Sequence, residues 1–445
     1  MAGIASLAPP ANAATPDAED LRAELDALKS DYTTRVQALE ERIKQLEANA
    51  VAAPPVASLP APALPPAPPR MSSASAFNPA ISMILSGNYA NLQRDPSTYR
   101  IAGFIPPPSG VGPDSRSVNL DESELTIAAN VDPYFFANAT AAIQGDGGIE
   151  IEEAYFKTLA LNNGLTLKGG RFFSGVGYLN EIHSHTWDFI DQPLAYQVLF
   201  GGQRSQDGAQ LRWVASTDTF LELGAETGNG RGFPGNIRAS NGLSGNALFA
   251  HVGGDVGDST SWRLGASWLD DRSEDRRFDD VDVQGSAVVN AFTGRSQTWI
   301  VDATLKWAPH GDSTQHQLKL QGEYLHRHEQ GQLVFDVDAT KRSSNYDRSQ
   351  SGWYLQSAYQ FMPRWRAGLR YDALQSGTPD TALANFVSLQ RASPQRMTVM
   401  LDWTLSEFSR LRAQYAWDQT RAEQSDREFR LQYIFAIGAH GAHKF

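Results

Sequence analysis

Two histidines, His183 and His185, stand two positions apart in the long stretch 173–203 of the chain. In an extended backbone, residues spaced by two point the same way, so both imidazoles can face one ligand. Glu181, Asp188 and Asp191 lie close by, and imidazole with carboxylate oxygens is a donor set that suits zinc. Two interpretations stay open: a metal site with Asp188 and Asp191 as further ligands, or polar groups that only tune a water-filled passage.

A second pair, His326 and His328, precedes Glu329. It is either a surface site for transient metal capture or a set of ordinary polar residues. We interpret His440 and His443 as scattered polar residues. The sequence therefore predicts no resident cofactor. Zinc is the one candidate ion, with His183, His185, His326 and His328 as its candidate ligands.

Several other kinds of chemistry are excluded. Ser184 lies between two histidines, but a catalytic triad also needs a positioned acid and an oxyanion hole, and neither can be placed. We therefore expect no enzyme. The chain has no cysteine, which excludes disulfides and thiolate metal sites. Its net charge of -12 argues against a nucleic-acid partner, because phosphate binding needs a basic surface.

The segments that must position these residues alternate with a period of two. From residue 77 to residue 445 we count sixteen stretches in which apolar and polar residues alternate. In one of them Trp299, Val301 and Trp307 share a face, while Asp302 and Lys306 share the other. Apolar faces that end in aromatic residues are typical of strands that face lipid, with polar faces lining a wet interior. The sequence predicts an all-β fold, an antiparallel transmembrane β-barrel of sixteen strands over residues 77–445.

The connections between these stretches alternate in length. One set is short, as at residues 132–133 and 362–364, and the other is mostly long, as at 271–297 and 326–350. Short periplasmic turns opposite long outer loops are typical of outer-membrane barrels, and an even strand number brings both chain ends to the periplasm. The first histidine pair falls in the third long connection, residues 173–203.

The polar faces, assigned by parity, hold twelve basic and eight acidic residues, Glu124 and Glu153 among the acidic ones. We expect a mildly basic lumen whose charges select ions. The alternative is that opposite charges neutralise each other and only keep the lumen hydrated. The candidate lumen charges are Arg171, Arg212, Arg263, Lys306, Lys319, Arg366, Arg370, Arg410, Arg412, Glu222, Asp302 and Asp402.

The N-terminal part of the chain follows other patterns. Residues 1–13 combine a short apolar stretch with Ala11-Asn12-Ala13, as in the remnant of a signal peptide. Residues 18–48 carry an apolar seam with heptad-like spacing, which predicts a self-associating coiled coil. Residues 49–76 are rich in alanine and proline, which predicts an extended linker. Together they predict a homo-oligomer.

On these features, residues 77–445 resemble the sixteen-stranded porins of Gram-negative bacteria, and the coiled coil resembles that of sugar-specific and phosphate-selective porins, which are trimers. An alternating last strand that ends in Phe445 resembles the assembly signal of such barrels. Residues 122–143, 152–161, 165–213, 352–372 and 438–445 resemble proteobacterial outer-membrane proteins, some of them labelled zinc-regulated. The resemblance implies a trimer and makes residues 173–203 a constriction loop, with Glu181, His183, His185, Asp188 and Asp191 at the pore.

Our leading functional hypothesis is an outer-membrane channel for passive diffusion of small hydrophilic solutes or ions, with a link to zinc supply. Its N-terminal region would lie in the periplasm, and outer-membrane lipid would surround the barrel. The rival hypothesis is a plugged barrel that acts as an envelope tether or surface-binding protein, its coiled coil contacting peptidoglycan.

Overall fold

The computed structural model describes residues 79–445 except 109, 146, 237, 239–240 and 439–445. Two compact units are present, residues 1–72 and 73–445, and the described residues all belong to the second. The predicted signal peptide, coiled coil and linker lie outside the described residues, and so do His440, His443 and Phe445. Within the described part, no helix is long and apolar enough to cross a membrane.

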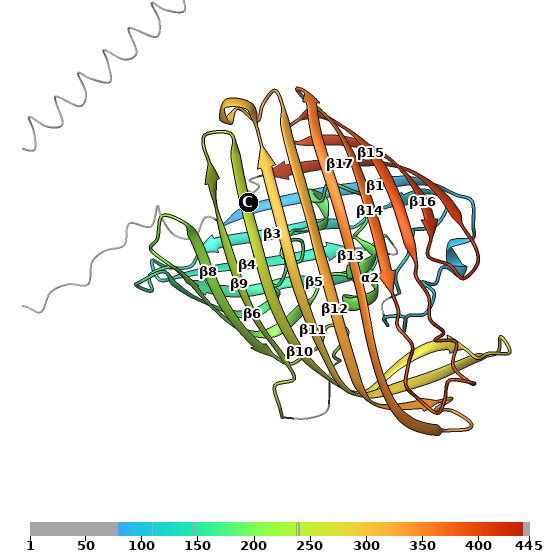
Figure 1. Cartoon of the computed structure of the whole chain (residues 1–445). Helices are drawn as coiled ribbons and strands as arrows, with labels where there is room; N and C mark the ends of the chain where they lie inside the picture. Colours follow the sequence, from blue (N-terminus) through green and yellow to red (C-terminus); the bar gives the residue numbers. More distant parts are fainter. Residues whose placement is uncertain (1–78, 109, 146, 237, 239–240, 439–445) are drawn as a thin grey trace, which may run out of the picture. The chain divides into compact units, whose positions relative to one another are not determined.

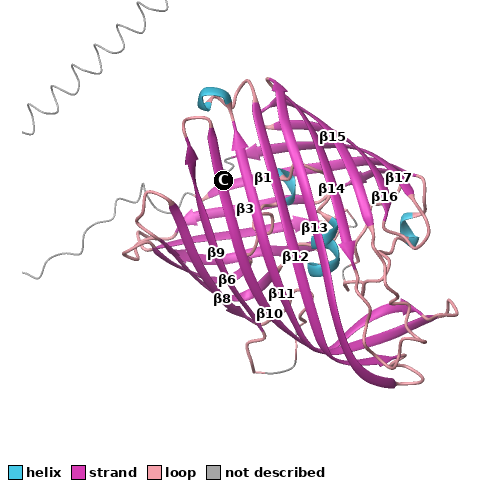
Figure 2. Cartoon of the chain, viewed as in Figure 1, coloured by secondary structure: helices cyan, strands magenta, loops and turns pink. Residues whose placement is uncertain are grey.

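The described chain is an antiparallel β-barrel (Figure 1 and Figure 2). Its strands are β1 (Ala80–Leu92), β2 (Ser117–Leu120), β3 (Ser123–Asn130), β4 (Phe135–Ile143), β5 (Ile149–Thr158), β6 (Leu165–Phe173), β7 (Ser205–Val214), β8 (Phe220–Gly228), β9 (Gly245–Val256), β10 (Thr260–Val281), β11 (Ala287–Trp307), β12 (Gln317–Phe335), β13 (Arg342–Met362), β14 (Trp365–Gln375), β15 (Gln395–Ser406), β16 (Ser409–Gln419) and β17 (Asp426–Gly438). The helical elements are η1 (Pro96–Thr98), η2 (Ser184–Thr186), α2 (Leu194–Phe200) and η3 (Pro309–Gly311).

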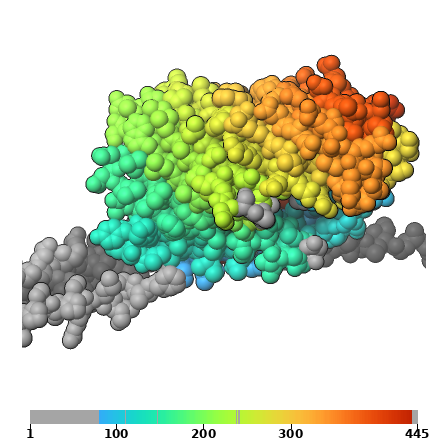
Figure 3. All heavy atoms as spheres, turned by 90° about the horizontal axis from the view of Figure 1, so that it is seen from below, coloured from blue at the N-terminus to red at the C-terminus, as the bar shows by residue number. Residues whose placement is uncertain are grey.

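The sheet closes on itself. β1 pairs with β17 along one edge and with β2 and β3 along the other, while each later strand pairs with the next in sequence. In the space-filling view of Figure 3 the colours accordingly run in sequence order across the surface. β2 and β3 together act as one interrupted strand beside β1, so the seventeen strands fill sixteen positions. This confirms the predicted fold class.

The outside of the barrel carries an apolar belt edged by aromatic residues. Val301 and Leu355 are exposed on it. Trp268 and Trp299 pair at the end that faces the long connections, with ring centroids 6.2 Å apart. Trp365 and Trp403 stack at the short-turn end, 5.8 Å apart. Aromatic rings at both ends of an exposed apolar belt are the arrangement that suits a lipid bilayer.

Strands β10 to β13 are far longer than the sequence pattern indicates, with 22, 21, 19 and 21 residues. The prediction of long connections at 271–297 and 326–350 is therefore wrong. The chain turns only at 282–286 and 336–341, and the rest of both stretches is strand.

A small apolar cluster explains these extensions. Phe278, Phe292 and Leu333 point inward from them and are buried together with Leu383 and Leu389 of the connection between β14 and β15. Burying such side chains contributes about 1.5–3 kcal/mol each. The strands stay paired beyond the apolar belt because this buried cluster supports them.

The belt can be tested by placing a charge on it. Ala303 is exposed on β11 between Trp299 and Trp307, near the middle of the belt. We expect Ala303→Arg to destabilise the barrel in lipid vesicles by about 2–4 kcal/mol, the cost of arginine at the bilayer midplane. Urea-dependent unfolding measures it. The matched control is Ala382→Arg in an exposed connection, and equal effects of both changes would contradict a lipid-facing belt.

Candidate functional site

The connection between β6 and β7, residues 174–204, folds into the barrel; we call it the inner loop. Its helix α2 is buried at all seven positions and contacts β13 and β14 (Figure 1). Gly201 ends this helix in the left-handed conformation, with φ of 66°, and its N–H donates to the carbonyl of Gln197. Gly352 of β13 leaves room for it, because a Cβ at that position would lie 3.0 Å from the Cβ of Ala195.

One carboxylate of the barrel wall holds the inner loop in place near α2. Glu323 on β12 is buried and accepts hydrogen bonds from the backbone N–H groups of Tyr178 and Leu179, at 3.2 and 3.0 Å. It also accepts from the hydroxyls of Tyr196 and Tyr354, at 2.8 and 2.6 Å. Three of these four donors belong to the inner loop, so Glu323 fixes its path across the lumen.

Basic residues of β12, β14 and β15 hold the loop's two aspartates. Asp188 accepts from Lys319 at 2.9 Å and from Arg366 at 3.1 Å. Asp191 pairs with Arg370 and Arg396, both at 2.9 Å. Burial alone would raise the pKa of Asp188, but Lys319 and Arg366 outweigh it and hold that pKa well below its usual range.

Arginines of β16 bind the loop's backbone. Arg412 donates to the carbonyl of Trp187 at 2.7 Å, and Arg410 donates to the carbonyl of His185. The two predicted metal ligands Asp188 and Asp191 thus face basic side chains rather than the imidazoles.

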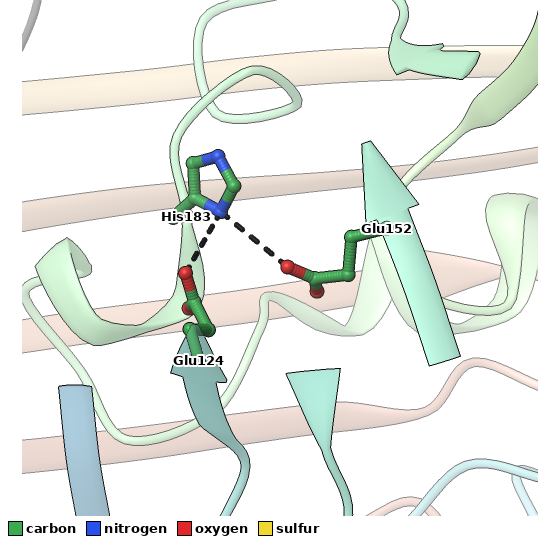
Figure 4. Close-up of side chains that lie close together, drawn as sticks. All are labelled: Glu124, Glu152 and His183. Carbon is green, nitrogen blue, oxygen red and sulfur yellow. Dashed lines mark ion pairs between the residues drawn. The ribbon is translucent and has the colours of Figure 1, made fainter. Parts of the chain in front are cut away.

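The histidines lie instead against carboxylates of β3 and β5 (Figure 4). His183 Nδ1 lies 3.1 Å from Oε2 of Glu124 and 3.5 Å from Oε2 of Glu152, and its Nε2 lies 3.2 Å from Oε2 of Glu153. His185 Nδ1 lies 2.8 Å from Oε1 of Glu124. Burial alone would lower the pKa of His183, but these three glutamates outweigh it and raise that pKa well above its usual value.

A β-bulge brings Glu152 and Glu153 to the same side. Across from β5, Thr140 pairs with Glu153 and Ala141 pairs with Ile151, which leaves Glu152 without a partner on β4. Such an extra residue bends the strand and redirects a side chain. Strict alternation places Glu153 in the lumen and Glu152 outside, which is why Glu152 is absent from the sequence-based candidates. The sequence feature that indicated the bulge was the pair of adjacent glutamates in an otherwise alternating strand.

The other candidate residues fall into three places. Glu181 pairs with Arg212 in the lumen. His326 and His328 lie on the same strand face as the exposed Tyr324, and so on the outside. The remaining candidate lumen charges on the inner side of the wall are Arg263, Lys306, Lys319, Arg366, Arg370, Arg410, Arg412, Glu222, Asp302 and Asp402.

Arg171 is a correction to the lumen assignment. It pairs with Asp207 at 2.6 Å, and the two face each other across β6 and β7. Asp207 shares its strand face with Leu211 and Trp213, which are exposed. Arg171 therefore lies on the outer face. Arg171 stands three residues after the buried Lys168, and residues an odd number apart in a strand point to opposite faces.

Two neighbouring cavities lie beside the inner loop, of about 960 and 510 Å³. Glu122, Gln144, Glu150, Trp187 and Gly201 line both. The charged side chains around the two cavities are mostly acidic, among the described residues: Asp114, Asp121, Glu122, Glu150, Glu152 and Asp191 against Arg231 and His185. A third cavity of about 530 Å³, lined by Glu181, Arg212 and Glu222, opens toward the short-turn end.

A closed antiparallel barrel with an inward-folded, charge-anchored loop is the class of protein that these observations define. No family model matches the chain. A protein of Aquifex aeolicus (strain VF5), described as uncharacterized, is 31% identical over 399 residues, which cover 84% of this chain and 81% of that protein. The chain belongs to the same family as this protein.

Three solved structures are among those similar to this chain. In vitro folded OmpT of Vibrio cholerae is 11% identical, with a TM-score of 0.49, and the match covers 81% of this chain and 97% of OmpT. The outer membrane channel DcaP of Acinetobacter baumannii is 14% identical, with a TM-score of 0.48 and coverage of 82% and 99%. OprB of Pseudomonas putida is 14% identical, with a TM-score of 0.47 and coverage of 81% and 94%.

The anchoring role of Glu323 leads to a prediction. Glu323→Ala leaves four buried donors without an acceptor, each costing about 1–3 kcal/mol. We expect the amides of Tyr178 and Leu179 to exchange with deuterium much faster, while the amides of β12 stay protected. The matched control is Glu274→Ala, whose side chain is exposed on β10. Unchanged exchange at Tyr178 and Leu179 would show that the loop does not depend on Glu323.

Proposed function

We propose that this protein is an outer-membrane channel for passive diffusion of small hydrophilic solutes, with a preference for cations. One observation carries the preference: the charges of the lumen are segregated. The basic side chains of β14 to β16 are bound to the inner loop or to wall carboxylates, whereas carboxylates line the two cavities beside that loop. A pore selects ions by the charges that remain available to them.

Three further features support a channel. The apolar belt with aromatic edges suits a bilayer. Beside the apolar clusters around α2 and Phe292, the inner face of the wall carries many buried polar and charged side chains, which suits a hydrated lumen. Space remains beside the inner loop, since Glu181 of that loop lines the cavity at the short-turn end and His185 lines the cavity of about 960 Å³.

The orientation and assembly form part of the proposal. Ser82, near the start of β1, pairs with Gly438 at the end of β17, so both ends of the described barrel lie at the short-turn rim. We propose that this rim faces the periplasm, where residues 18–48 would join three chains as a coiled coil and contact peptidoglycan.

The channel is testable by electrical recording. Purified full-length protein in a planar lipid bilayer is expected to give stable current steps of uniform size, because the inner loop is fixed in place by many hydrogen bonds. Absence of current from folded, inserted protein would contradict the channel and favour a plugged barrel that serves as an envelope tether.

The cation preference makes a separate prediction. Glu122 lines both cavities beside the inner loop. We expect Glu122→Gln, which keeps the size of the side chain, to lower the cation-to-anion permeability ratio measured from reversal potentials in a potassium chloride gradient. Asp279→Asn, on the exposed face of β10, is the control that should leave the ratio unchanged. An anion-selective wild type would overturn the proposed preference.

A further inference from the structure

We propose that Glu124, Glu152 and His183 bind a first-row divalent transition-metal ion where the inner loop meets the wall (Figure 4). The three ligands come from β3, β5 and the inner loop. Figure 4 shows both carboxylates directed at one edge of the imidazole ring. Among the described residues, this is the group of three whose ligand atoms all lie within 4.8 Å of one another.

The spacing of the ligand atoms matches a metal centre. Zinc bonds to nitrogen and oxygen are about 2.0–2.2 Å long, so two ligands at a tetrahedral ion stand about 3.3 Å apart. Nδ1 of His183 lies 3.1 Å from Oε2 of Glu124 and 3.5 Å from Oε2 of Glu152. These two distances bracket the value for a tetrahedral ion.

Two ligand atoms of this group are buried without a well-formed hydrogen bond. Nδ1 of His183 is within ion-pair distance of Oε2 of Glu124 and Oε2 of Glu152, yet neither Nδ1 nor Oε2 of Glu152 has a hydrogen-bond partner in the described structure. Buried polar atoms are nearly always satisfied, so atoms of this kind call for an explanation. An ion between them would satisfy both at once, and it would displace the proton that these carboxylates otherwise stabilise on the ring.

The surrounding residues orient the ligands as they do around metal ions. Oε2 of Glu153 lies 3.2 Å from Nε2 of His183 and accepts from it, so an ion would bind Nδ1, on the side of Glu124 and Glu152. Glu153 is itself held by the N–H of Phe173 at 3.2 Å. The second oxygen of Glu124 accepts from His185 at 2.8 Å. Ligating histidines and carboxylates commonly have such partners, which fix the ring and raise the basicity of the ligand.

The kinds of ligand atom, and the route by which an ion can reach them, define the class of ion. One imidazole nitrogen and two carboxylate oxygens suit zinc and its first-row neighbours, whereas magnesium prefers oxygen ligands alone and gives up its water reluctantly. Glu152 also lines the 510 Å³ cavity, so an ion can arrive from there and keep water in its fourth position.

A bound ion would tie the inner loop to β3 and β5. On the basic side the loop is fastened by Asp188 and Asp191, and on the acidic side the ion would add to the contacts that His183 and His185 make with glutamates. That consequence for conduction rests on the proposed channel function, but binding of the ion does not.

The test uses the full chain in detergent, stripped with a chelator and titrated with zinc chloride alone by isothermal titration calorimetry, with bound metal counted by mass spectrometry. We expect one zinc ion per chain. His183→Ala and Glu152→Gln should remove it, and Glu153→Gln should weaken binding by about 10–100-fold, as loss of an orienting partner does. Circular dichroism and heat-modifiable migration in gels confirm that each variant is folded.

The matched control replaces the outward pair, His326→Ala with His328→Ala, and should leave the zinc stoichiometry unchanged. Wild-type protein that binds no zinc, or zinc that is lost with the outward pair and kept in His183→Ala, would overturn the site. Conductance is recorded on the same preparations. A barrel that conducts but binds no zinc overturns this inference alone, and a silent barrel that binds zinc overturns the channel alone.

Discussion

The fold depends on one constraint: the backbone of a strand in lipid has no water to satisfy its N–H and C=O groups, so a sheet must close. Here β1 meets β17 with Ser82 opposite Gly438 and Leu92 opposite Glu428, and this pairing removes the last edge. In the closed barrel, alternate residues of each strand face two different environments, lipid outside and the lumen inside. Val301 faces outward because Asp302 must face inward. Among the described residues, every candidate functional residue except His326, His328 and Arg171 lies in the interior that results.

Closure alone leaves a wide polar lumen, and opposite charges decide how the inner loop crosses it. Asp188 and Asp191 bind arginines on one side, while His183 and His185 bind glutamates on the other. Buried ion pairs add little net stability, because each charge loses its water, but removing one partner is costly. These pairs therefore determine the position of the loop more than they stabilise the fold. Glu323 also determines the position of the loop in the lumen, through the four hydrogen bonds that it accepts.

The strands could be predicted from the sequence because each repeats a two-residue pattern that lipid enforces locally. The prediction was wrong where another influence takes over. Beyond the apolar belt, β10 to β13 continue because Phe278 and Phe292 are buried against Leu383 and Leu389, a contact between distant segments that no local pattern shows. Glu152 was missed because a bulge breaks the alternation at that residue. Arg171 was misplaced because it stands three residues from the inward Lys168, and an odd separation puts two side chains on opposite faces of a strand.

The lumen charges show why a count of residue types does not give a pore its preference. By parity the wall holds more basic than acidic groups, yet Arg366, Arg370 and Arg412 each bind a carboxylate at short range. A paired arginine offers a passing ion a dipole rather than a full charge, and its field falls off quickly. The carboxylates Asp121, Glu122 and Glu150 line the 960 Å³ cavity beside the inner loop. In the proposed channel a solute would therefore meet mainly negative charge, because the inner loop engages the basic side chains of the lumen and leaves these carboxylates beside the cavities.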